Sequence, residues 1–299
     1  MACRREVHWI LARRRYNLAE WWHLLSLDAP TVAALWSWFF ARAMHLRLSL
    51  VPPLLLALGT WLLYVADRIL DGLRQRPGEL VQERHRFHAR HRTAFLVAAS
   101  LLVVLLAWFV LTRMRPEARR DDAWIAAFAL LYLFAVHRRT ASVYPNAPRL
   151  PKELAVGILF AAATAVPAWS RLSAGAGLGK VQLAPAIVFF AMLCWVNCVG
   201  IEKWEAGCTL PQALGNPHAT TRWASLHLRP IVTMIALFSL AAAVLAPSRG
   251  LMAVYLAALL SSGLLFALDT RSSHLSPLYL RIAADAALLT PLAFFPIAR

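Results

Sequence analysis

The sequence predicts an all-α integral membrane protein with about nine transmembrane helices in one bundle and a cytoplasmic N-terminus. First, 60% of the 299 residues are hydrophobic and only 15% are charged, with a mean hydropathy of +0.57. Second, apolar runs of about 20 residues, the length that crosses roughly 30 Å of hydrocarbon, recur along the chain. Third, Lys and Arg gather in alternate connections. This composition excludes an ordinary water-soluble domain.

Nine apolar runs are predicted to span the membrane. An earlier stretch, residues 8–27, mixes Trp, Leu, Arg and His without enough apolar length to cross, and it predicts an amphipathic helix at the interface. The predicted organisation is an interfacial N-terminal segment, 1–28, followed by a single membrane domain, 29–299. The nine runs are 29–46, 49–68, 93–112, 122–138, 153–171, 183–202, 229–247, 250–268 and 277–297.

The basic residues predict the orientation and the partners. In the nine-span arrangement, 21 of the 31 Lys and Arg residues lie on the side of the N-terminus and 10 on the other, which favours a cytoplasmic N-terminus. The net charge of +16 suits anionic lipid or a polyanionic substrate, whereas the apolar composition argues against nucleic acid. No cleavable signal peptide is evident. We expect a multi-pass protein of a bacterial-type inner, cytoplasmic membrane.

Two carboxylates end the second predicted span. Asp67 and Asp71 are four residues apart, so both project from one face of a helix. Mg²⁺ prefers one or two carboxylates together with waters and phosphate oxygens, and this pair provides such ligands. The alternative is that both acids pair with Arg68, Arg74 or another interfacial arginine. The spacing alone does not separate the two interpretations.

The segment after this span, 74–92, is strongly basic and lies on the same predicted side of the membrane. Arg74 and Arg86 offer donors to a diphosphate, and they would equally serve a positively charged loop against anionic lipid. The histidines in this segment suggest a membrane iron oxygenase as a weaker hypothesis. The other histidines are scattered singly and form no second ligand cluster.

Acidic residues also end the sixth predicted span. Glu202 and Glu205 are three residues apart and share a face, and Asn197 adds a neutral oxygen earlier in the same run. The alternative is salt bridges with Lys203 and other interfacial bases. Between the two acidic ends, the proline-rich segment 144–153 cannot form a continuous helix. It carries Tyr144 and Lys152, and it suits either a lid over an anion or a rigid turn.

These stretches together resemble the UbiA superfamily of intramembrane prenyltransferases. Asp67 and Asp71 match the last two aspartates of that family's first aspartate-rich motif. The Gly and Thr-Leu-Pro that follow the second motif in many members are similar to residues 207–211 here. If Asn197 is aligned with the Asn of the second motif, Glu205 is its one acid, and a shift by one residue brings in Glu202. The stretch from Tyr144 through Lys152 to Gly157 is loosely similar to a family segment near helix five.

The resemblance implies nine helices around a cavity that opens laterally to lipid. It implies Mg²⁺-dependent transfer of a prenyl group from an allylic isoprenoid diphosphate to an aromatic or other lipophilic acceptor at the cytoplasmic face. The alternative function is a non-catalytic lipid-binding or transport protein that retains the fold. The prenyl chain length, the acceptor and the oligomeric state are not specified by these motifs. The implied metal ligands and catalytic residues are Asp67, Asp71, Glu202 and Glu205, and the implied substrate-binding residues are Asn197, Arg74, Arg86, Tyr144 and Lys152.

Overall fold

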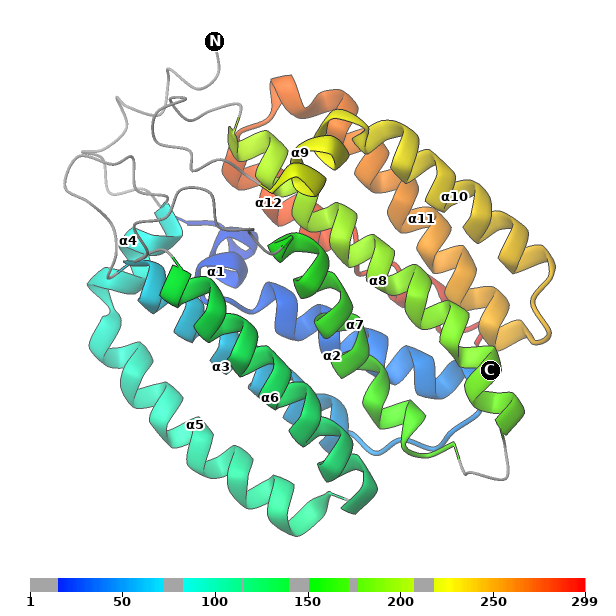
Figure 1. Cartoon of the computed structure of the whole chain (residues 1–299), viewed down its shortest axis with the longest axis horizontal. Coiled ribbons are helices and arrows are strands. Elements are labelled where there is room, and N and C mark those ends of the chain that lie inside the picture. The colour runs from blue at the N-terminus through cyan, green and yellow to red at the C-terminus, as the bar shows by residue number, and fades with distance from the viewer. Residues whose placement is uncertain are drawn as a thin grey trace.

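The computed structural model describes residues 16–72, 83–114, 116–139, 151–172, 177–206 and 218–298. All regular elements in these residues are helices, as Figure 1 shows, so the predicted all-α class is confirmed. The helices are α1 (Leu18–Leu24), α2 (Asp28–Ala43), α3 (Val51–Gly72), α4 (Glu83–Arg90), α5 (Arg92–Arg113), α6 (Pro116–Arg139), α7 (Lys152–Trp169), α8 (Gly177–Ala206), α9 (Ala219–Leu226), α10 (Leu228–Val244), α11 (Arg249–Arg271), a 3-10 turn (Ser272–His274), α12 (Pro277–Ala286) and α13 (Pro291–Phe294).

The chain is an all-α, multi-pass membrane protein. Among the described residues, six helical segments are long and apolar enough to cross a membrane, and up to eight are if each of two bent helix pairs counts as one span. The bent pairs are α1 with α2, at 90°, and α9 with α10, at 78°. The six segments are Val51–Asp71, Arg92–Arg113, Lys152–Trp169, Leu178–Ala206, Arg249–His274 and Pro277–Phe294.

The predicted span 122–138 lies in α6, which is outside this set of candidates. Charged residues occupy both ends of α6, and the stretch between Asp122 and Arg138 holds only 15 uncharged residues. That length is shorter than the roughly 20 residues that a perpendicular span needs. The run is a helix, as predicted. Because both of its ends are charged, its apolar part is shorter than that of the six candidate spans.

The last predicted span, 277–297, is not one helix. Helix α12 ends at Ala286, and α13 begins at Pro291, which has no backbone N–H to continue the hydrogen-bond ladder. In the turn between them, the carbonyl of Leu288 accepts a 2.7 Å hydrogen bond from Trp36 Nε1 of α2. The Trp36 side chain thus gives the Leu288 carbonyl a hydrogen-bond partner where the helix is interrupted.

Local sequence signals start and end helix α1, which lies at 90° to α2. Asn17 and Glu20 form a reciprocal capping box at its start, with hydrogen bonds of 2.8 and 2.9 Å. Ser26, after its end, has a φ of 60°, and the chain turns there into α2. The short helices α1, α4 and α9 lie at one end of the bundle in Figure 1.

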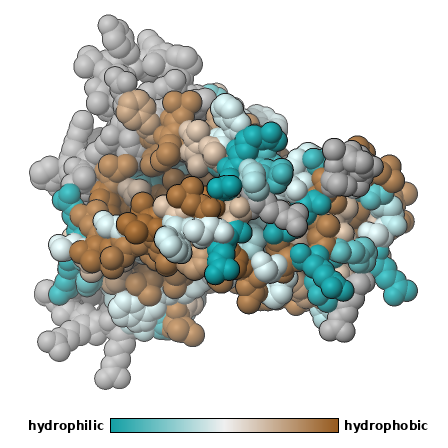
Figure 2. All heavy atoms as spheres, turned by 90° about the horizontal axis from the view of Figure 1, so that it is seen from below, coloured by the Kyte–Doolittle hydropathy of each residue, from teal (hydrophilic) through white to brown (hydrophobic). Residues whose placement is uncertain are grey.

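The interior is packed where α2 meets α8, and the periphery is apolar. Trp36 of α2 stacks on Phe190 of α8 with ring centroids 4.2 Å apart, and both side chains are fully buried. By contrast, Val104 and Trp108 of α5 are 70% and 65% exposed, which suits contact with lipid. Figure 2 shows hydrophobic residues over much of one face of the molecule, with hydrophilic side chains gathered in part of it.

Gly250, at the start of α11, permits a close approach of α11 to the end of α2. A Cβ atom at this position would lie 2.2 Å from the carbonyl oxygen of Ala43. We expect Gly250→Ala to destabilise the protein by about 1–3 kcal/mol, because backbone must move to admit the methyl group. The measurement is the midpoint of thermal unfolding in detergent.

Gly263→Ala is the matched control, because it lies on the same helix and its Cβ would have no neighbour within 4 Å. We expect this variant to change the stability by less than about 1 kcal/mol. Equal unfolding midpoints for the two variants would contradict the close packing of α11 on α2.

Candidate functional site

The ends of α3 and α8 and the start of α7 meet around one ammonium group. Lys152, the first residue of α7, places Nζ 3.7 Å from Glu202 Oε2 of α8 and 3.6 Å from Glu153 Oε1. Asp71, near the end of α3, also interacts electrostatically with Lys152. The two acidic helix ends noted in the sequence therefore lie on either side of one lysine.

Helices α6 and α9 complete this polar cluster. Glu153 is buried, and its Oε2 accepts a hydrogen bond from the Thr221 hydroxyl of α9. The Tyr132 hydroxyl of α6 donates to the carbonyl of Lys152 at 3.3 Å, and Tyr132 interacts electrostatically with Asp67 and Glu153. We call the charged residues of this cluster the acidic rim, which consists of Asp67, Asp71, Lys152, Glu153 and Glu202.

Glu205 pairs with a cation of another helix. Its Oε1 lies 2.5 Å from Arg281 Nη1 of α12. Lys203, the expected alternative partner of the two glutamates, instead binds Asp269 at 2.8 Å. Salt bridges thus engage both glutamates, Glu202 with Lys152 and Glu205 with Arg281. Among the described residues, the four acids proposed from the sequence do not include three whose oxygens lie within 4.8 Å of one another.

The other predicted site residues have separate positions. Arg86 is exposed on α4, whereas Arg74 and Tyr144, and the 207–211 stretch that resembles the family motif, lie outside the described residues. His88 and His91 have unrelated partners: His88 Nε2 bonds Ser26 Oγ at 3.1 Å, and His91 Nδ1 bonds the Phe87 carbonyl. Within the described part of the chain neither histidine joins a group of three potential metal ligands, which gives the iron hypothesis no geometric support.

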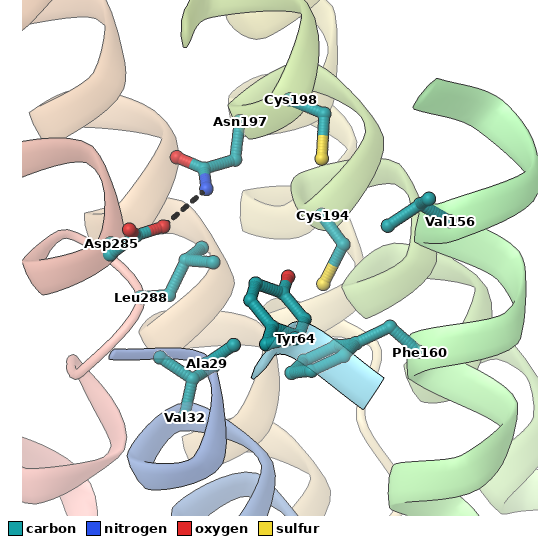
Figure 3. A pocket seen from close by; sticks show the side chains of 10 residues that line it. All are labelled: Ala29, Val32, Tyr64, Val156, Phe160, Cys194, Asn197, Cys198, Asp285 and Leu288. Carbon is teal, nitrogen blue, oxygen red and sulfur yellow. Dashed lines mark hydrogen bonds between the residues drawn. The ribbon is translucent and has the colours of Figure 1, made fainter. Parts of the chain in front are cut away.

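Asn197 lies at a small cavity inward of the rim, as Figure 3 shows. Its Nδ2 donates to Asp285 Oδ1 of α12 at 3.1 Å, while its buried Oδ1 has no hydrogen-bond partner. The cavity has a volume of about 30 Å³, enough for about two waters. Its lining residues are Ala29, Val32, Tyr64, Val156, Phe160, Cys194, Asn197, Cys198, Asp285 and Leu288.

The cavity lies directly inward of the acidic rim on the same three helices. Tyr64 precedes Asp67 by three residues on α3, and Val156 follows Lys152 by four on α7. Cys198 likewise precedes Glu202 by four residues on α8. At 1.5 Å per residue, each lining residue is about 4.5–6 Å from its rim partner along the helix axis. The rim and the cavity therefore adjoin along the same three helices.

A buried polar network lies behind Asp285. One carboxyl oxygen of Asp285 lies within 4.8 Å of one of Asp28, the first residue of α2. Asp28 Oδ2 is 2.7 Å from His23 Nδ1 of α1 and 3.7 Å from Arg68 Nη2 of α3. His23, Asp28 and Arg68 are all at most 4% exposed. Three helices and the inner wall of the cavity are thus joined by charged side chains.

Arg68 links this network to α4. Its Nη1 donates to Ser26 Oγ at 2.6 Å and to the His23 carbonyl at 3.1 Å. Because Ser26 Oγ accepts from Arg68, its own proton is available to His88 Nε2. We call the connected side chains the inner network, which consists of His23, Ser26, Asp28, Arg68, His88, Asn197 and Asp285.

Sequence reasoning missed most of the inner network. Arg68 was considered only as a partner for Asp67 and Asp71, and Asp28 and Asp285 were not weighed at all. The available signal was a carboxylate inside the apolar run 277–297, since charged residues inside spans are costly and need partners. Glu153 was also missed, although it follows Lys152 directly.

Two groups of side chains have the residue types that bind metal ions: one in the inner network and one at the acidic rim. One nitrogen of His23 and one oxygen each of Asp28 and Asp285 lie within 4.8 Å of one another, but Arg68 already supplies positive charge there. At the rim, Asp67, Asp71 and Glu202 offer the carboxylate oxygens that Mg²⁺ prefers. These acids are of the type that binds Mg²⁺, but among the described residues no three of them bring oxygens within 4.8 Å of one another.

No family model matches the chain, and no curated protein or solved structure matches it either.

Proposed function

We propose that the chain is a membrane prenyltransferase that resembles the UbiA superfamily. It transfers a prenyl group from an allylic isoprenoid diphosphate to an aromatic or other lipophilic acceptor, at the cytoplasmic face of a bacterial-type inner membrane. The observation that carries this proposal is the meeting of α3, α7 and α8 at the acidic rim, directly outward of the cavity lined by Tyr64 and Asn197.

The direction of the helices supports nine spans with the N-terminus inside. Helices α3, α6, α8 and α11 end at the rim end of the bundle, and α2, α7, α10 and α12 begin there. In this topology α6 is counted as a ninth span: the whole helix of 24 residues extends about 36 Å along its axis, so its charged ends would lie at the two interfaces and its short uncharged stretch between them. The rim then lies on the side that carries most of the Lys and Arg residues.

The rim suits the diphosphate of the substrate. The Lys152 side chain is 53% exposed, so its ammonium group is accessible to a ligand while it compensates the surrounding carboxylates. Asp67, Asp71 and Glu202 would hold Mg²⁺ beside it. A bound Mg²⁺ would neutralise charge that develops on the departing diphosphate. Arg86, exposed on α4, is a further candidate for this role.

The proposed prenyl transfer breaks one bond at the rim and forms another at the allylic carbon. The bond between the allylic carbon and its diphosphate oxygen breaks, and the oxygen retains the electron pair. Lys152 stabilises this negative charge, and such stabilisation of a leaving group is often the largest single contribution to catalysis. The acceptor then forms the new bond to the allylic carbon, while the apolar prenyl chain lies among the helices.

The alternative function is a lipid-binding or transport protein without catalysis. The observation that favours it is the pairing of Glu202 with Lys152 and of Glu205 with Arg281, which neutralises acids of the second motif within the protein. A protein of this kind would have no need of Mg²⁺ to bind its ligand. Dependence on the metal therefore separates the two functions.

The first experiment is binding of radiolabelled geranylgeranyl diphosphate to the detergent-purified protein, with and without Mg²⁺. We expect binding that requires Mg²⁺ and that falls at least about tenfold in Asp67→Asn, because a ligand to the metal is lost. Asp121→Asn, on α6 far from the rim in sequence, should bind as the wild type does. No binding by the wild type, with diphosphates of several chain lengths, would favour the non-catalytic function.

A further inference from the structure

Basic residues gather at the end of the bundle opposite the acidic rim. Helices α2 and α7 end there, and α8 and α11 begin there, as Figure 1 shows. The sequence segments 42–50, 169–180 and 245–250, which include these helix ends, contain five Lys and Arg residues and no Asp or Glu. We call the five residues the distal basic cluster, which consists of Arg42, Arg47, Arg171, Lys180 and Arg249.

The starts of α8 and α11 pack on the end of α2. The backbone of Ala43 leaves no space for a Cβ atom at Gly250, the second residue of α11. A Cβ atom at Gly179, near the start of α8, would lie 3.8 Å from Met44 Cε. Arg42 directly precedes this part of α2, and each of the two glycines is next to a basic residue in the chain. Three members of the cluster are therefore attached to one area of the bundle end.

Most of this positive charge has no acidic partner. At the rim end, Lys152 and Arg281 each pair with a glutamate. Among the ion pairs of the described residues, by contrast, none joins Arg42, Lys180 or Arg249 to an acid. The charge at the distal end is thus available to an anion that does not belong to the described chain.

Arg42 also has a buried polar atom that needs an acceptor. Its neighbours Ala41 and Ala43 are at most 1% exposed, and Arg42 Nε is itself buried and has no hydrogen-bond partner. A buried N–H group without an acceptor is costly. The residue as a whole is only partly buried, so a ligand has room to approach it. Phosphate suits a guanidinium group, because its oxygens match the planar fork of N–H donors.

Trp169 indicates that the cluster lies at the level of the lipid headgroups. Lys152 and Trp169 are the first and last residues of α7, so they are about 26 Å apart along the helix axis. This length is close to the roughly 30 Å of the hydrocarbon layer, and Trp is enriched at its two boundaries. Lys180 Nζ lies 5.4 Å from the centroid of the Trp169 ring. The ammonium group is therefore near the interface opposite the rim.

Exposed aliphatic side chains flank the basic ones. Leu178 and Val181, close to Lys180 on α8, are 72% and 69% exposed. Leu245, four residues before Arg249, is 81% exposed. A soluble anion would leave these side chains uncovered, whereas a phospholipid offers a phosphate to the cations and acyl chains to the aliphatic groups.

We propose that the distal basic cluster binds a phospholipid that has a negatively charged headgroup. The headgroup lies against Arg42 and Lys180 and joins the end of α2 to the start of α8, and the acyl chains lie along Leu178 and Val181. A lipid with a net negative charge compensates the unpaired cations, whereas a zwitterionic lipid brings its own cation. This inference does not depend on the proposed prenyl transfer, because it concerns the opposite end of the bundle.

The experiment is photo-cross-linking of the full-length protein in a bilayer of phosphatidylcholine. A small fraction of the lipid is either phosphatidylglycerol or phosphatidylcholine with the same photoreactive acyl chain, and the labelled residues are mapped by mass spectrometry. We expect phosphatidylglycerol to label Leu178 and Val181 at least about fivefold more than phosphatidylcholine does, the effect of one basic residue near an anionic headgroup. Val104 and Trp108, on the exposed face of α5, should be labelled equally by the two lipids.

The main variant carries Lys180→Gln and Arg249→Gln. Neither side chain has a hydrogen bond or ion pair within the described protein, so both replacements should leave the fold intact. The preference for phosphatidylglycerol at Leu178 and Val181 should fall to the level of the α5 face. The matched control carries Arg119→Gln and Arg120→Gln, which remove the same charge at the start of α6, and it should keep the wild-type preference.

Three results would overturn the proposal: equal labelling of the wild type by both lipids, an unchanged preference in the main variant, or equal losses in the main variant and the control. The last would reveal an effect of net charge alone. Arg42→Gln should also reduce the preference, and an unchanged preference in this variant would exclude Arg42 from the headgroup site.

A competition experiment separates the lipid from a soluble anion. Glycerol phosphate has the charge of the headgroup but no acyl chains, so millimolar amounts, on the order of a weak-binding concentration, should leave the labelling of Leu178 and Val181 unchanged. Loss of the labelling preference on addition of glycerol phosphate would show a site for soluble anions and would overturn the assignment to a lipid.

Discussion

Asp71→Asn is expected to reduce prenyl transfer by about 100-fold or more, the size of effect seen when one group that stabilises developing charge is removed. Asp71 lies at the end of α3 and interacts with Lys152, which in turn lies 3.7 Å from Glu202. An amide in its place is neutral and is a weaker ligand for a hard cation. The measurement is product formation in membranes supplied with labelled geranylgeranyl diphosphate and an acceptor extract.

The control for this experiment is Asp121→Asn, which removes a carboxylate near the start of α6. It should leave product formation unchanged, because Asp121 is far from the rim residues along the chain and pairs at 3.8 Å with its exposed neighbour Arg120. Undiminished product formation in Asp71→Asn would remove this residue from the metal site. Equal losses in both variants would point to a general effect of charge removal on the protein.

Arg68→Met is expected to lower the free energy of unfolding by about 3–5 kcal/mol, the usual cost of leaving one partner of a buried ion pair uncompensated. Arg68 is 4% exposed and contacts Asp28, Ser26 and the His23 carbonyl. Its loss leaves the Asp28 and Asp285 pair without the neighbouring cation. The measurement is unfolding of the detergent-solubilised protein by increasing amounts of a denaturing detergent, followed by circular dichroism.

The double variant Arg68→Met, Asp28→Asn tests the cause of that loss. Removal of the carboxylate together with the arginine should recover part of the stability, and the interaction energy follows from the complete double-mutant cycle. A cycle in which the two single effects simply add would show that Arg68 stabilises the fold through packing alone. A single Arg68→Met variant as stable as the wild type would contradict the buried ion pair.

The acidic rim could be anticipated because its residues are grouped by local spacing. Asp67 and Asp71 share a face through their separation of four residues, and Glu202 ends another apolar run on the same predicted side of the membrane. Their proximity to Lys152 is a tertiary result. Whether Glu205 contacts the same lysine or Arg281 depends on the rotation of α8 against α12, which the spacing of acids within α8 does not specify.

The inner network was not anticipated because its members come from six separate helices and the turn after α1. His23, Arg68 and Asp285 are distant in sequence, and no local pattern relates them. Each looks like an isolated polar residue next to an apolar run. Only the packing of α1, α3 and α12 around Asp28 shows that their charges compensate one another.

The sequence by itself determined that the chain is a helical membrane protein, and it determined the approximate ends of the long helices. The reason is that a helix must present about 20 apolar residues to cross the hydrocarbon layer. It also located the two acidic helix ends. The tertiary structure decided the break between α12 and α13, where Trp36 of α2 donates to the carbonyl of Leu288, and the pairing of Glu205 with Arg281. It alone decided the inner network and the cavity beside it. The physical reason is that helix formation depends on neighbours within a few residues, whereas charge compensation in a membrane interior depends on which helix faces pack together.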